Sequence, residues 1–336
     1  MSEACARPTP DLPVLAVDRL SVTFASGRAS VRVVDDVSFT LGQGEILALL
    51  GESGCGKSMT ALAIMGLVPG AGRPGGRVML DGEALLDVPP DRLRALRGQR
   101  MAMVFQDPMS ALNPVLSLGN QIGEALRCHT GLRRAALRDR VVALLGEVGL
   151  ADPAQVADRF PHELSGGMCQ RVMIAMAIAC DPGLLIADEP TTALDVTVQK
   201  QILDLLHGLR RRHRTAILLI THDLGVVAEN ADRVAVMYAG QVVEEAPVAV
   251  LYARPAHPYT LGLLRSMPRL ESRPDDDPGS FYAIPGTVPD PANLPPGCRF
   301  EPRCDRADQA CRETAPALEA LRPDHRVRCW HPVAGP

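Results

Sequence analysis

The stretch Glu45 to Ser58 (EILALLGESGCGKS) joins a short apolar run to a glycine-rich loop. The loop fills every fixed position of the eight-residue phosphate-loop (Walker A) pattern, and a helical pattern follows it from Ser58 to Gly66. Glycines let a backbone curl until successive N–H groups and a helix N-terminus point at one anion. The stretch therefore predicts a nucleotide-phosphate site built from Gly51, Ser53, Gly54, Cys55, Gly56, Lys57 and Ser58.

Two side chains of this loop have distinct expected roles. Lys57 is one of only two lysines in the chain, although the chain has 35 basic residues. A compact ammonium on a flexible stem suits terminal phosphates better than the planar arginine fork. The Ser58 hydroxyl is placed to bind Mg²⁺. A glycine-rich turn can also be only a tight turn, but the four filled positions favour phosphate binding.

Composition excludes several classes of protein. The 336 residues are 46% hydrophobic and 22% charged, which argues against disorder, collagen-like repeats and coiled coil. The net charge of −4 leaves no dominant field for nucleic acid, so no nucleic-acid partner is expected. The longest apolar stretch, Val172 to Cys180, is about half of the roughly 20 residues that span a bilayer. Met1 to Pro10 lacks the apolar core of a secretory signal, so a cytoplasmic location with reduced thiols is expected.

Short apolar runs alternate with longer helical patterns up to about Gln241, which predicts an α/β fold. Near-continuous apolar character suits strands that are covered on both faces, so most of them should be central and parallel. Residues 107–160 lose strand signals and gain apolar residues at helical spacing, which predicts an inserted helical subdomain. The expected strands are Glu45 to Leu50, Arg100 to Phe105, Leu184 to Ala187, Ala216 to Ile220 and Val234 to Met237.

Two adjacent carboxylates, Asp188 and Glu189, end the third of these strands. Alone the pair is a weak signal, because buried strands often end in acids that cap the next turn. Together with a phosphate loop, Asp188 becomes the expected Mg²⁺ ligand, and Glu189 the group that orients or deprotonates an attacking water.

A second anion site is predicted at Leu164-Ser165-Gly166-Gly167, which precedes a helical pattern from Met168 to Ala179. Ser165 is a good N-cap residue. A plain cap would need only the serine, so the pair Gly166 and Gly167 indicates close approach of a ligand to the helix N-terminus.

These segments resemble the ATP-binding cassette family, whose signature is a Leu-Ser-Gly-Gly sequence shortly before an Asp-Glu strand. The resemblance covers roughly residues 15–245. It implies a P-loop NTPase fold, an α/β nucleotide-binding domain with a helical subdomain, and ATP with Mg²⁺ as ligands. It also implies that two cassettes pair head to tail, each ATP lying between one phosphate loop and the other cassette's signature.

The family's remaining positions are placed one at a time by the same resemblance. Gln106 is similar to the glutamine that links Mg²⁺ and water to the membrane partner, and His222 to the histidine that contacts the γ-phosphate. Asp195 lies in a segment similar to the loop that couples the two sites. Phe24 is the candidate for stacking on adenine. A lone His at a strand end can also be an ordinary surface group, and an aromatic can simply fill a core.

Two departures from the family pattern bear on nucleotide binding. Met59 intervenes between Ser58 and Thr60, which leaves in doubt any contact of that threonine with phosphates. Cys169 stands where a polar or basic residue is common, and this change is expected to weaken contact with the partner cassette's ATP.

Finer resemblances concern the transported substrate. Phe105 to Pro114 (FQDPMSALNP) and His257 to Thr260 (HPYT) are similar to the dipeptide and oligopeptide importer ATPases, although nickel and glutathione importers share parts of both. Residues 284–331 resemble the C-terminal extension of the peptide importers. The last 86 residues hold 15 of the 29 prolines, so we expect a nucleotide-binding domain at 1–250 and an extension at 251–336 with a turn-rich linker at 271–279.

Four cysteines crowd the extension: Cys298, Cys304, Cys311 and Cys329. Their spacing does not match the close pairs of common zinc ribbons. A [4Fe–4S] cluster, a structural zinc that involves His325 or His331, and unligated thiols all remain open from the residues alone. Resemblance to the peptide-importer extension favours the cluster.

The family resemblance implies an ATP-hydrolysing, energy-coupling subunit of an importer for dipeptides or oligopeptides. Its expected partners are a second cassette subunit that is a distinct homologue, two transmembrane permeases and an extracytoplasmic peptide-binding protein. It would then sit at the cytoplasmic face of the inner membrane. A nickel or glutathione importer ATPase, a soluble non-transport cassette and a regulatory cassette without turnover are the alternatives.

Overall fold

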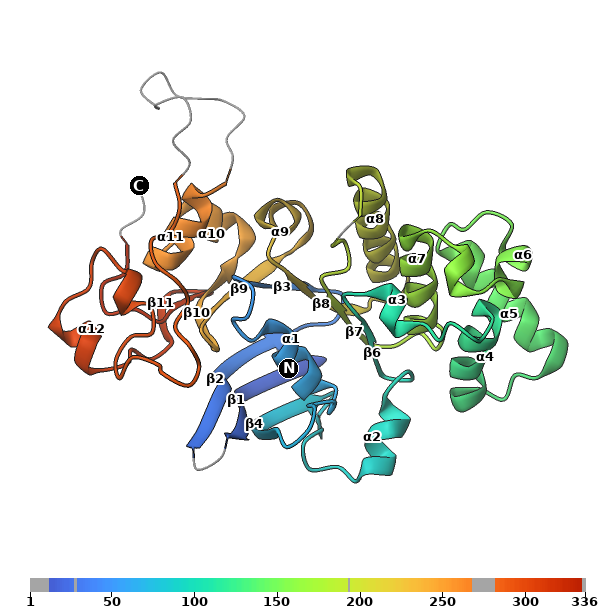
Figure 1. Cartoon of the computed structure of the whole chain (residues 1–336), viewed down its shortest axis with the longest axis horizontal. Coiled ribbons are helices and arrows are strands. Elements are labelled where there is room, and N and C mark those ends of the chain that lie inside the picture. Colours follow the sequence, from blue (N-terminus) through green and yellow to red (C-terminus); the bar gives the residue numbers. More distant parts are fainter. Residues whose placement is uncertain (1–11, 27–28, 193, 268–281, 334–336) are drawn as a thin grey trace, which may run out of the picture.

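A computed structural model describes residues 12–26, 29–192, 194–267 and 282–333. Its centre is an eight-stranded sheet with the order β11-β12-β10-β9-β3-β8-β7-β6. The strands β9, β3, β8, β7 and β6 are parallel, and β10 pairs antiparallel with β9. Figure 1 shows this sheet between the helical subdomain on one side and the C-terminal extension on the other. The parallel strands are β3 (Ile46–Leu50), β6 (Met101–Val104), β7 (Leu184–Asp188), β8 (Ala216–Thr221) and β9 (Arg233–Tyr238), of which β6 lies at the edge of the sheet.

The five expected strands are therefore present, parallel and buried. In β7 and β8 successive side chains point to opposite faces. Leu184 and Ile186 pack with α1 and the N-terminal strands, whereas Leu185 and Ala187 pack against the helices of the other face. Both faces are covered, so every position from Leu184 to Ala187 in β7 and from Ala216 to Ile220 in β8 is apolar.

A second, antiparallel sheet with the order β2-β1-β4-β5 covers one face of the core. It has no counterpart among the strands expected from the sequence. Its strands are β1 (Leu15–Ser26), β2 (Ala29–Leu41), β4 (Arg73–Leu80) and β5 (Glu83–Ala84). The helices α1 (Lys57–Ile64) and α2 (Pro90–Leu96) belong to the same half of the molecule (Figure 1).

The expected helical subdomain is present between β6 and β7. Apolar side chains of α4, α5 and α7 pack in one cluster with the helix face of the core sheet. The subdomain consists of α3 (Pro108–Ala111), α4 (Leu118–His129), α5 (Arg134–Glu147), α6 (Pro153–Asp158), the 3-10 turn η1 (Pro161–Glu163) and α7 (Gly166–Ala177). Two further core helices follow, α8 (Val196–His213) and α9 (Leu224–Asn230).

The C-terminal extension continues the core sheet, because β12 pairs antiparallel with β10 and β11 pairs with β12. The predicted linker at 271–279 lies outside the described residues. The elements here are β10 (Gln241–Pro247), α10 (Val248–Ala253), α11 (Pro258–Arg265), η2 (Glu301–Arg303), α12 (Gln309–Glu313), β11 (Glu319–Arg322) and β12 (His325–Val327). In the described part of the chain, no helix combines the length and apolarity that crossing a membrane requires.

Candidate nucleotide site and four-cysteine site

The phosphate loop connects β3 to α1 and holds Lys57 in a buried position, 5% exposed. The Lys57 ammonium donates to the Gly51 carbonyl at 2.7 Å and to the Glu52 carbonyl at 3.0 Å. The loop thus encircles the amine with its own carbonyl groups. An anion that enters the loop would meet a lysine already held beside it.

Two glycines of the loop are required by close contacts. A Cβ at Gly51 would lie 2.3 Å from the Met237 carbonyl oxygen, so no other residue fits there. Gly56 has a φ of +103°, and its Cβ would lie 2.9 Å from the Val33 carbonyl oxygen. The sequence pattern is thus explained by the strands that pack against the loop, as well as by its curvature.

Thr60, which Met59 displaces from the usual position, and the loop residue Cys55 both have buried side chains. Thr60 is fully buried, and its hydroxyl donates to the Gly56 carbonyl at 2.9 Å, so it stabilises the first turn of α1. Cys55 turns its thiol inward beside Lys57, where burial raises the pKa of that thiol. The Cys55 thiol therefore points away from the phosphate position, and only the Cys55 backbone is placed to face a phosphate.

Asp188 and Ser58, the two residues expected to hold Mg²⁺, lie in contact. The Ser58 hydroxyl donates to Asp188 Oδ1 at 3.1 Å. Burial raises the pKa of Asp188, and this hydrogen bond offsets only part of that effect. Hydroxyl and carboxylate oxygens are the donors that Mg²⁺ prefers, and the cation would favour the ionised form of Asp188. The residues present therefore fit the metal that the fold implies.

Glu189 is the centre of a hydrogen-bond network that joins three segments. Its Oε2 accepts from Gln106 Nε2 at 3.0 Å and from the Thr192 hydroxyl at 2.9 Å, and its Oε1 lies 3.1 Å from His222 Nδ1. The backbone N–H of Glu189 donates to the Ile220 carbonyl, and its φ of +46° is unusual for a residue with a side chain. The predicted catalytic residues Glu189, Gln106 and His222 are therefore in contact.

This network also sets the charge of Glu189. Partial burial raises the pKa of its carboxyl, but hydrogen bonds from His222 and Thr192 outweigh burial, so the pKa is lower than usual. The group is consequently a carboxylate at neutral pH. A carboxylate at this position can orient a water molecule and accept its proton.

The signature segment presents an open helix N-terminus. Ser165 occupies the N-cap position of α7, as predicted, but within the described residues its hydroxyl makes no capping hydrogen bond. Ser165 and Gly166 are exposed, and a Cβ at Gly166 would meet open space. Gly167 lies against α8, where a Cβ would come within 2.8 Å of a Val198 methyl group. The end of α7 is thus accessible for an external ligand.

The expected weakening by Cys169 of contact with a partner's nucleotide stays a prediction, but the structure shows where this side chain lies. The side chain of Cys169 is fully buried, and its thiol lies 3.5 Å from the Pro161 carbonyl oxygen. It packs in the apolar cluster that the helical subdomain shares with the core sheet.

Asp195 and Phe24 lie apart from this network. Asp195 is the N-cap of α8, and its carboxylate accepts from the Val198 backbone N–H at 3.0 Å. Phe24 is half-buried on β1 and its ring packs beside Gly72, whose added Cβ would lie 2.7 Å from the ring. The coupling role of Asp195 and adenine stacking by Phe24 remain predictions.

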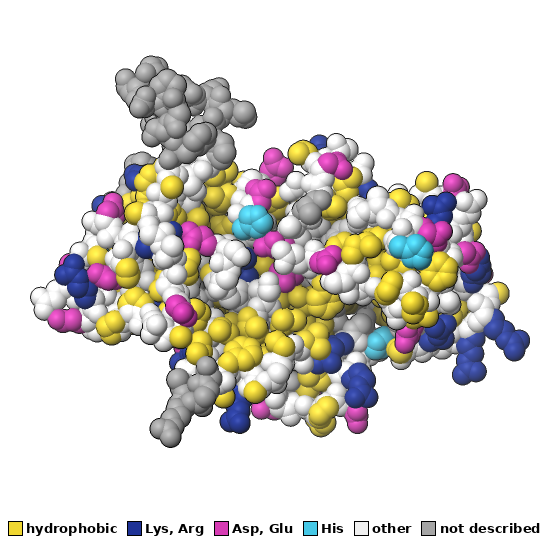
Figure 2. All heavy atoms as spheres, in the orientation of Figure 1, with side chains coloured by type: hydrophobic (Ala, Val, Ile, Leu, Met, Phe, Trp, Pro, Cys, Tyr) yellow, Lys and Arg dark blue, Asp and Glu magenta, His cyan; other side chains and the backbone are white. Residues whose placement is uncertain are grey.

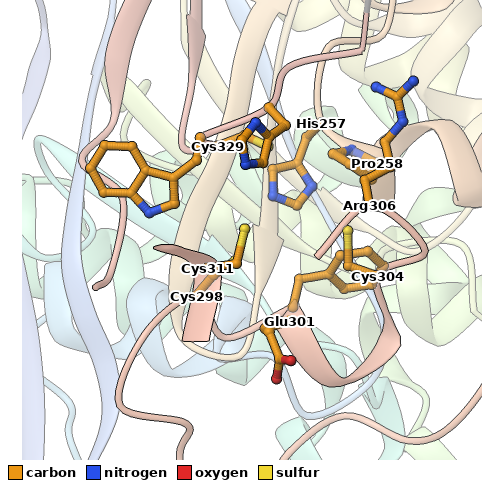
Figure 3. Close-up of a pocket in the computed structure, with 11 residues that line it drawn as sticks. His257, Pro258, Cys298, Glu301, Cys304, Arg306, Cys311 and Cys329 are labelled. Atoms are coloured by element: carbon orange, nitrogen blue, oxygen red, sulfur yellow. The ribbon is translucent and has the colours of Figure 1, made fainter. Parts of the chain in front are cut away.

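The four cysteines of the extension gather around one small cavity, although up to 31 positions separate them. Figure 3 shows Cys298, Cys304, Cys311 and Cys329 around this cavity beside His257 and Pro258. All four are free thiols. Burial raises the pKa of each of the four, and for Cys329, which lies near the other three, the pKa rises to about 12.

This donor set fits a thiophilic metal centre, because a bound cation would supply the charge that favours thiolates. Of the two histidines considered for zinc, only His331 lines the cavity. Its ring, Cys311 and Asp308 have ligand atoms within 4.8 Å of one another. The prediction of His325 as a zinc ligand is wrong, because its Nε2 lies 2.8 Å from the buried Glu244 carboxylate.

Sequence reasoning missed three residues that touch the site. Thr192 follows Glu189 at a spacing that allows a turn, which was an available signal. Tyr259 and Arg303, which contact the loop residue Glu52, come from the extension and carry no motif that points to a phosphate loop.

Known proteins share both halves of the chain. A model of the ABC transporter family matches residues 34–192, and a model of the oligopeptide/dipeptide transporter C-terminal region matches residues 243–311. The oligopeptide transport ATP-binding protein OppD of Salmonella typhimurium is 47% identical over 98% of this chain and 97% of its own length. The dipeptide transport ATP-binding protein DppD of Escherichia coli is 46% identical over 96% and 98%. A putative peptide import ATP-binding protein of Brucella abortus is 51% identical over 94% of each chain.

Solved structures show the same cassette fold. The dimeric post-hydrolysis cassette MJ0796 bound to ADP and Pi superposes with a TM-score of 0.63 at 28% identity, over 70% of this chain and 98% of that chain. The cbiO1 cassette of Clostridium perfringens gives 0.61 at 27% identity, over 72% and 91%. The site geometry and the near full-length identity to curated relatives agree: the chain belongs to the ATP-binding cassette ATPases of the oligopeptide and dipeptide transporter family.

Proposed function

We propose that this chain hydrolyses ATP to drive the import of dipeptides or oligopeptides. The observation that carries the proposal is the convergence of predicted site residues at the carboxyl ends of the parallel strands. Ser58 contacts Asp188, and Glu189 contacts both Gln106 and His222. Matches to peptide-transporter relatives over both halves of the chain support peptides as the substrate class.

Each residue of the site has a role in this proposal. Lys57 and the loop N–H groups would bind the β- and γ-phosphates, and Ser58 and Asp188 would hold Mg²⁺, which would neutralise phosphate charge. Glu189 orients the attacking water and accepts its proton, while Gln106 and His222 fix the direction of that carboxylate. His222, whose side chain is 59% exposed, is free to reach a γ-phosphate.

A second cassette completes the site. The exposed turn at Ser165 and Gly166 offers N–H groups to a nucleotide that another subunit binds. Val196, beside the cap residue Asp195, is 81% exposed, which suits a contact between subunits. We infer that two cassettes associate through these surfaces, the second being a distinct homologue.

The helical subdomain carries the surface for membrane partners. Hydrophobic side chains reach the surface there, on the right of Figure 2. Met109 and Val115, just after Gln106, are 48% and 76% exposed, and Leu116 and Phe160 are each 36% exposed. An exposed apolar surface of this kind indicates a protein contact. We propose that two permeases dock here at the cytoplasmic face of the inner membrane, supplied by an extracytoplasmic peptide-binding protein.

The transport proposal is tested by peptide uptake in cells that lack other peptide importers. The chain is expressed together with the two permeases, the peptide-binding protein and the second ATPase that form the proposed importer. Labelled dipeptides and longer peptides should enter, and Lys57→Ala should abolish uptake. Uptake of nickel or glutathione instead of peptides would overturn the substrate class in favour of those alternatives.

For the four-cysteine site we propose a [4Fe–4S] cluster bound by Cys298, Cys304, Cys311 and Cys329. Four thiols around one cavity supply the ligand number that such a cluster takes. Anaerobic purification should yield a brown protein with about four irons and four sulfides per chain. A colourless protein with stoichiometric zinc would overturn the cluster in favour of zinc, with His331 as an available ligand.

A further inference from the structure

The phosphate loop carries an acidic residue, Glu52, whose contacts come largely from the C-terminal extension. Its carbonyl accepts from Lys57, so its backbone is part of the cradle around that ammonium. Its N–H donates to the hydroxyl of Tyr259 on α11 at 3.0 Å. A carboxylate in such a loop would repel a triphosphate unless another group compensates its charge.

Arg303 supplies that compensation. Its guanidinium binds the Glu52 carboxylate through two nitrogens, with Nη1 at 2.9 Å from Oε2 and Nη2 at 3.2 Å from Oε1. The Arg303 side chain is 5% exposed and that of Glu52 28%, so solvent screens the pair poorly. The pairing neutralises the loop carboxylate and fixes its direction.

Arg303 is itself held rigidly. Its Nε donates to the Pro285 carbonyl at 2.8 Å, and its guanidinium lies 5.7 Å from the centre of the Tyr238 ring. Phe300 packs against Tyr238 and Tyr259 with ring centres 5.2 and 5.5 Å apart. The pairing of Arg303 with Glu52 therefore rests on an aromatic cluster, and a shift of the 298–304 segment would move Arg303 relative to Glu52.

The same segment carries two of the four cysteines. Cys304 directly follows Arg303, and Cys298 directly precedes Arg299. Arg299 pairs with Asp35, whose backbone N–H donates to the Gly240 carbonyl, and the Gly240 N–H donates to the carbonyl of Cys55 in the loop. Arg299 and Arg303, each next to a cysteine, thus connect the four-cysteine site to residues in or beside the phosphate loop.

We propose that Arg303 and Tyr259 are positioning residues for the phosphate loop and couple the four-cysteine segment to nucleotide affinity. Arg303 prevents Glu52 from repelling the nucleotide, and Tyr259 anchors the loop backbone at the same residue. Neither touches the reacting atoms. The inference rests on the proposed ATPase function, because it assigns these residues to that site.

The test measures the Kd of a fluorescent ATP analogue with Mg²⁺ for the purified full-length chain at low salt. Arg303→Ala should weaken binding roughly 5- to 30-fold, a typical range for coupled sites. Arg303→Lys, which keeps the charge but loses the two-nitrogen fork, should fall between the wild type and Arg303→Ala. Arg92→Ala is the matched control, because Arg92 also binds a carboxylate, that of Glu83, through two nitrogens at 2.8 Å but lies outside the site; its Kd should stay at the wild-type value.

The double variant Glu52→Gln with Arg303→Ala separates charge compensation from simple packing. It should recover to within about threefold of the wild-type Kd, because the uncompensated charge is gone. A double variant as weak as Arg303→Ala, or an Arg303→Ala variant with wild-type affinity, would overturn the inference. Absence of binding to the wild-type protein would instead refute the proposed function.

Two further variants test the anchor and the coupling. Tyr259→Phe should weaken nucleotide binding. If Arg303→Ala does not fold, this variant tests whether contacts from the extension position the phosphate loop. Cys304→Ser should weaken binding in the wild-type background and add nothing in the Arg303→Ala background. Additive effects of Cys304→Ser and Arg303→Ala would contradict the coupling, since independent sites add.

Discussion

Replacement of Glu189 by Gln should stop ATP turnover while leaving the site intact. The glutamine has the same length, and its single oxygen can take the place of Oε2, which accepts from Gln106 at 3.0 Å and from Thr192 at 2.9 Å. The new amide N–H₂ then faces His222 Nδ1, which can accept when the ring is neutral. The geometry is thus preserved, and only the carboxylate charge is lost.

The size of the effect follows from this chemistry. Loss of a positioned general base costs about 10²- to 10⁴-fold in rate, which corresponds to roughly 3–5 kcal/mol of transition-state stabilisation. Nucleotide affinity should remain within a few-fold of the wild type, because Lys57, Ser58 and Asp188 are unchanged. With ATP and Mg²⁺ the variant should accumulate as a closed pair of cassettes.

The assay combines phosphate release, equilibrium binding of labelled ATP and light scattering for the assembled mass. Glu83→Gln is the control, because Glu83 is a carboxylate paired with Arg92 at 2.8 Å, outside the site network. A Glu189→Gln protein that hydrolyses ATP within threefold of the wild type would remove Glu189 from the mechanism. Loss of nucleotide binding together with activity would show that the network, rather than the base, had failed.

Three further predictions follow from the geometry of the site. Gly51→Ala should abolish nucleotide binding and lower the melting temperature, because the new Cβ would meet the Met237 carbonyl at 2.3 Å; retained binding would contradict the tight loop. Asp195→Ala should cost about 1 kcal/mol in thermal or denaturant unfolding through loss of the α8 cap, and an unchanged stability would show the cap to be dispensable. At pH 8, iodoacetamide should modify the exposed Cys128 quickly and Cys169 slowly, because burial raises the pKa of the latter; equal rates by mass spectrometry would contradict the packing of α7.

The parallel core could be predicted because its strands are buried on both faces. Burial of this kind leaves no polar position in runs such as Leu184 to Ala187. Asp188 and Glu189 could be predicted from their place at the end of such a strand together with the phosphate loop, whereas Gln106 and His222 were assigned by resemblance to the ATP-binding cassette family. In the structure Gln106 and His222 contact Glu189, and Asp188 accepts a hydrogen bond from Ser58 of the phosphate loop.

The antiparallel sheet could not be predicted in the same way, because β-bulges break the two-residue period of its strands. In β1 the inward residues Val17 and Leu20 are three positions apart, and Arg19 between them has a φ of +48°. In β2 a residue with a φ of +53°, Asp36, lies between the inward residues Val34 and Val37. An extra residue in each strand thus hides the alternation on which sequence reasoning depends.

Contacts between the C-terminal extension and the phosphate loop could not be predicted from the sequence either. Arg303 and Glu52 are 251 positions apart, and an arginine in an arginine-rich chain gives no signal by itself. The fold brings them together by seating the 298–304 segment against Tyr238, at the end of β9, through Phe300. Such pairings depend on tertiary packing, which local patterns do not encode.

The central claim is that the loop ahead of Lys57 binds a nucleotide triphosphate. The most direct measurement is equilibrium binding of Mg²⁺-ATP to the full-length chain and to its Lys57→Ala variant. The wild-type chain should bind one nucleotide saturably, and Lys57→Ala should lose most of that affinity while keeping its melting temperature. No binding by the wild type, or equal binding by both proteins, would contradict the account.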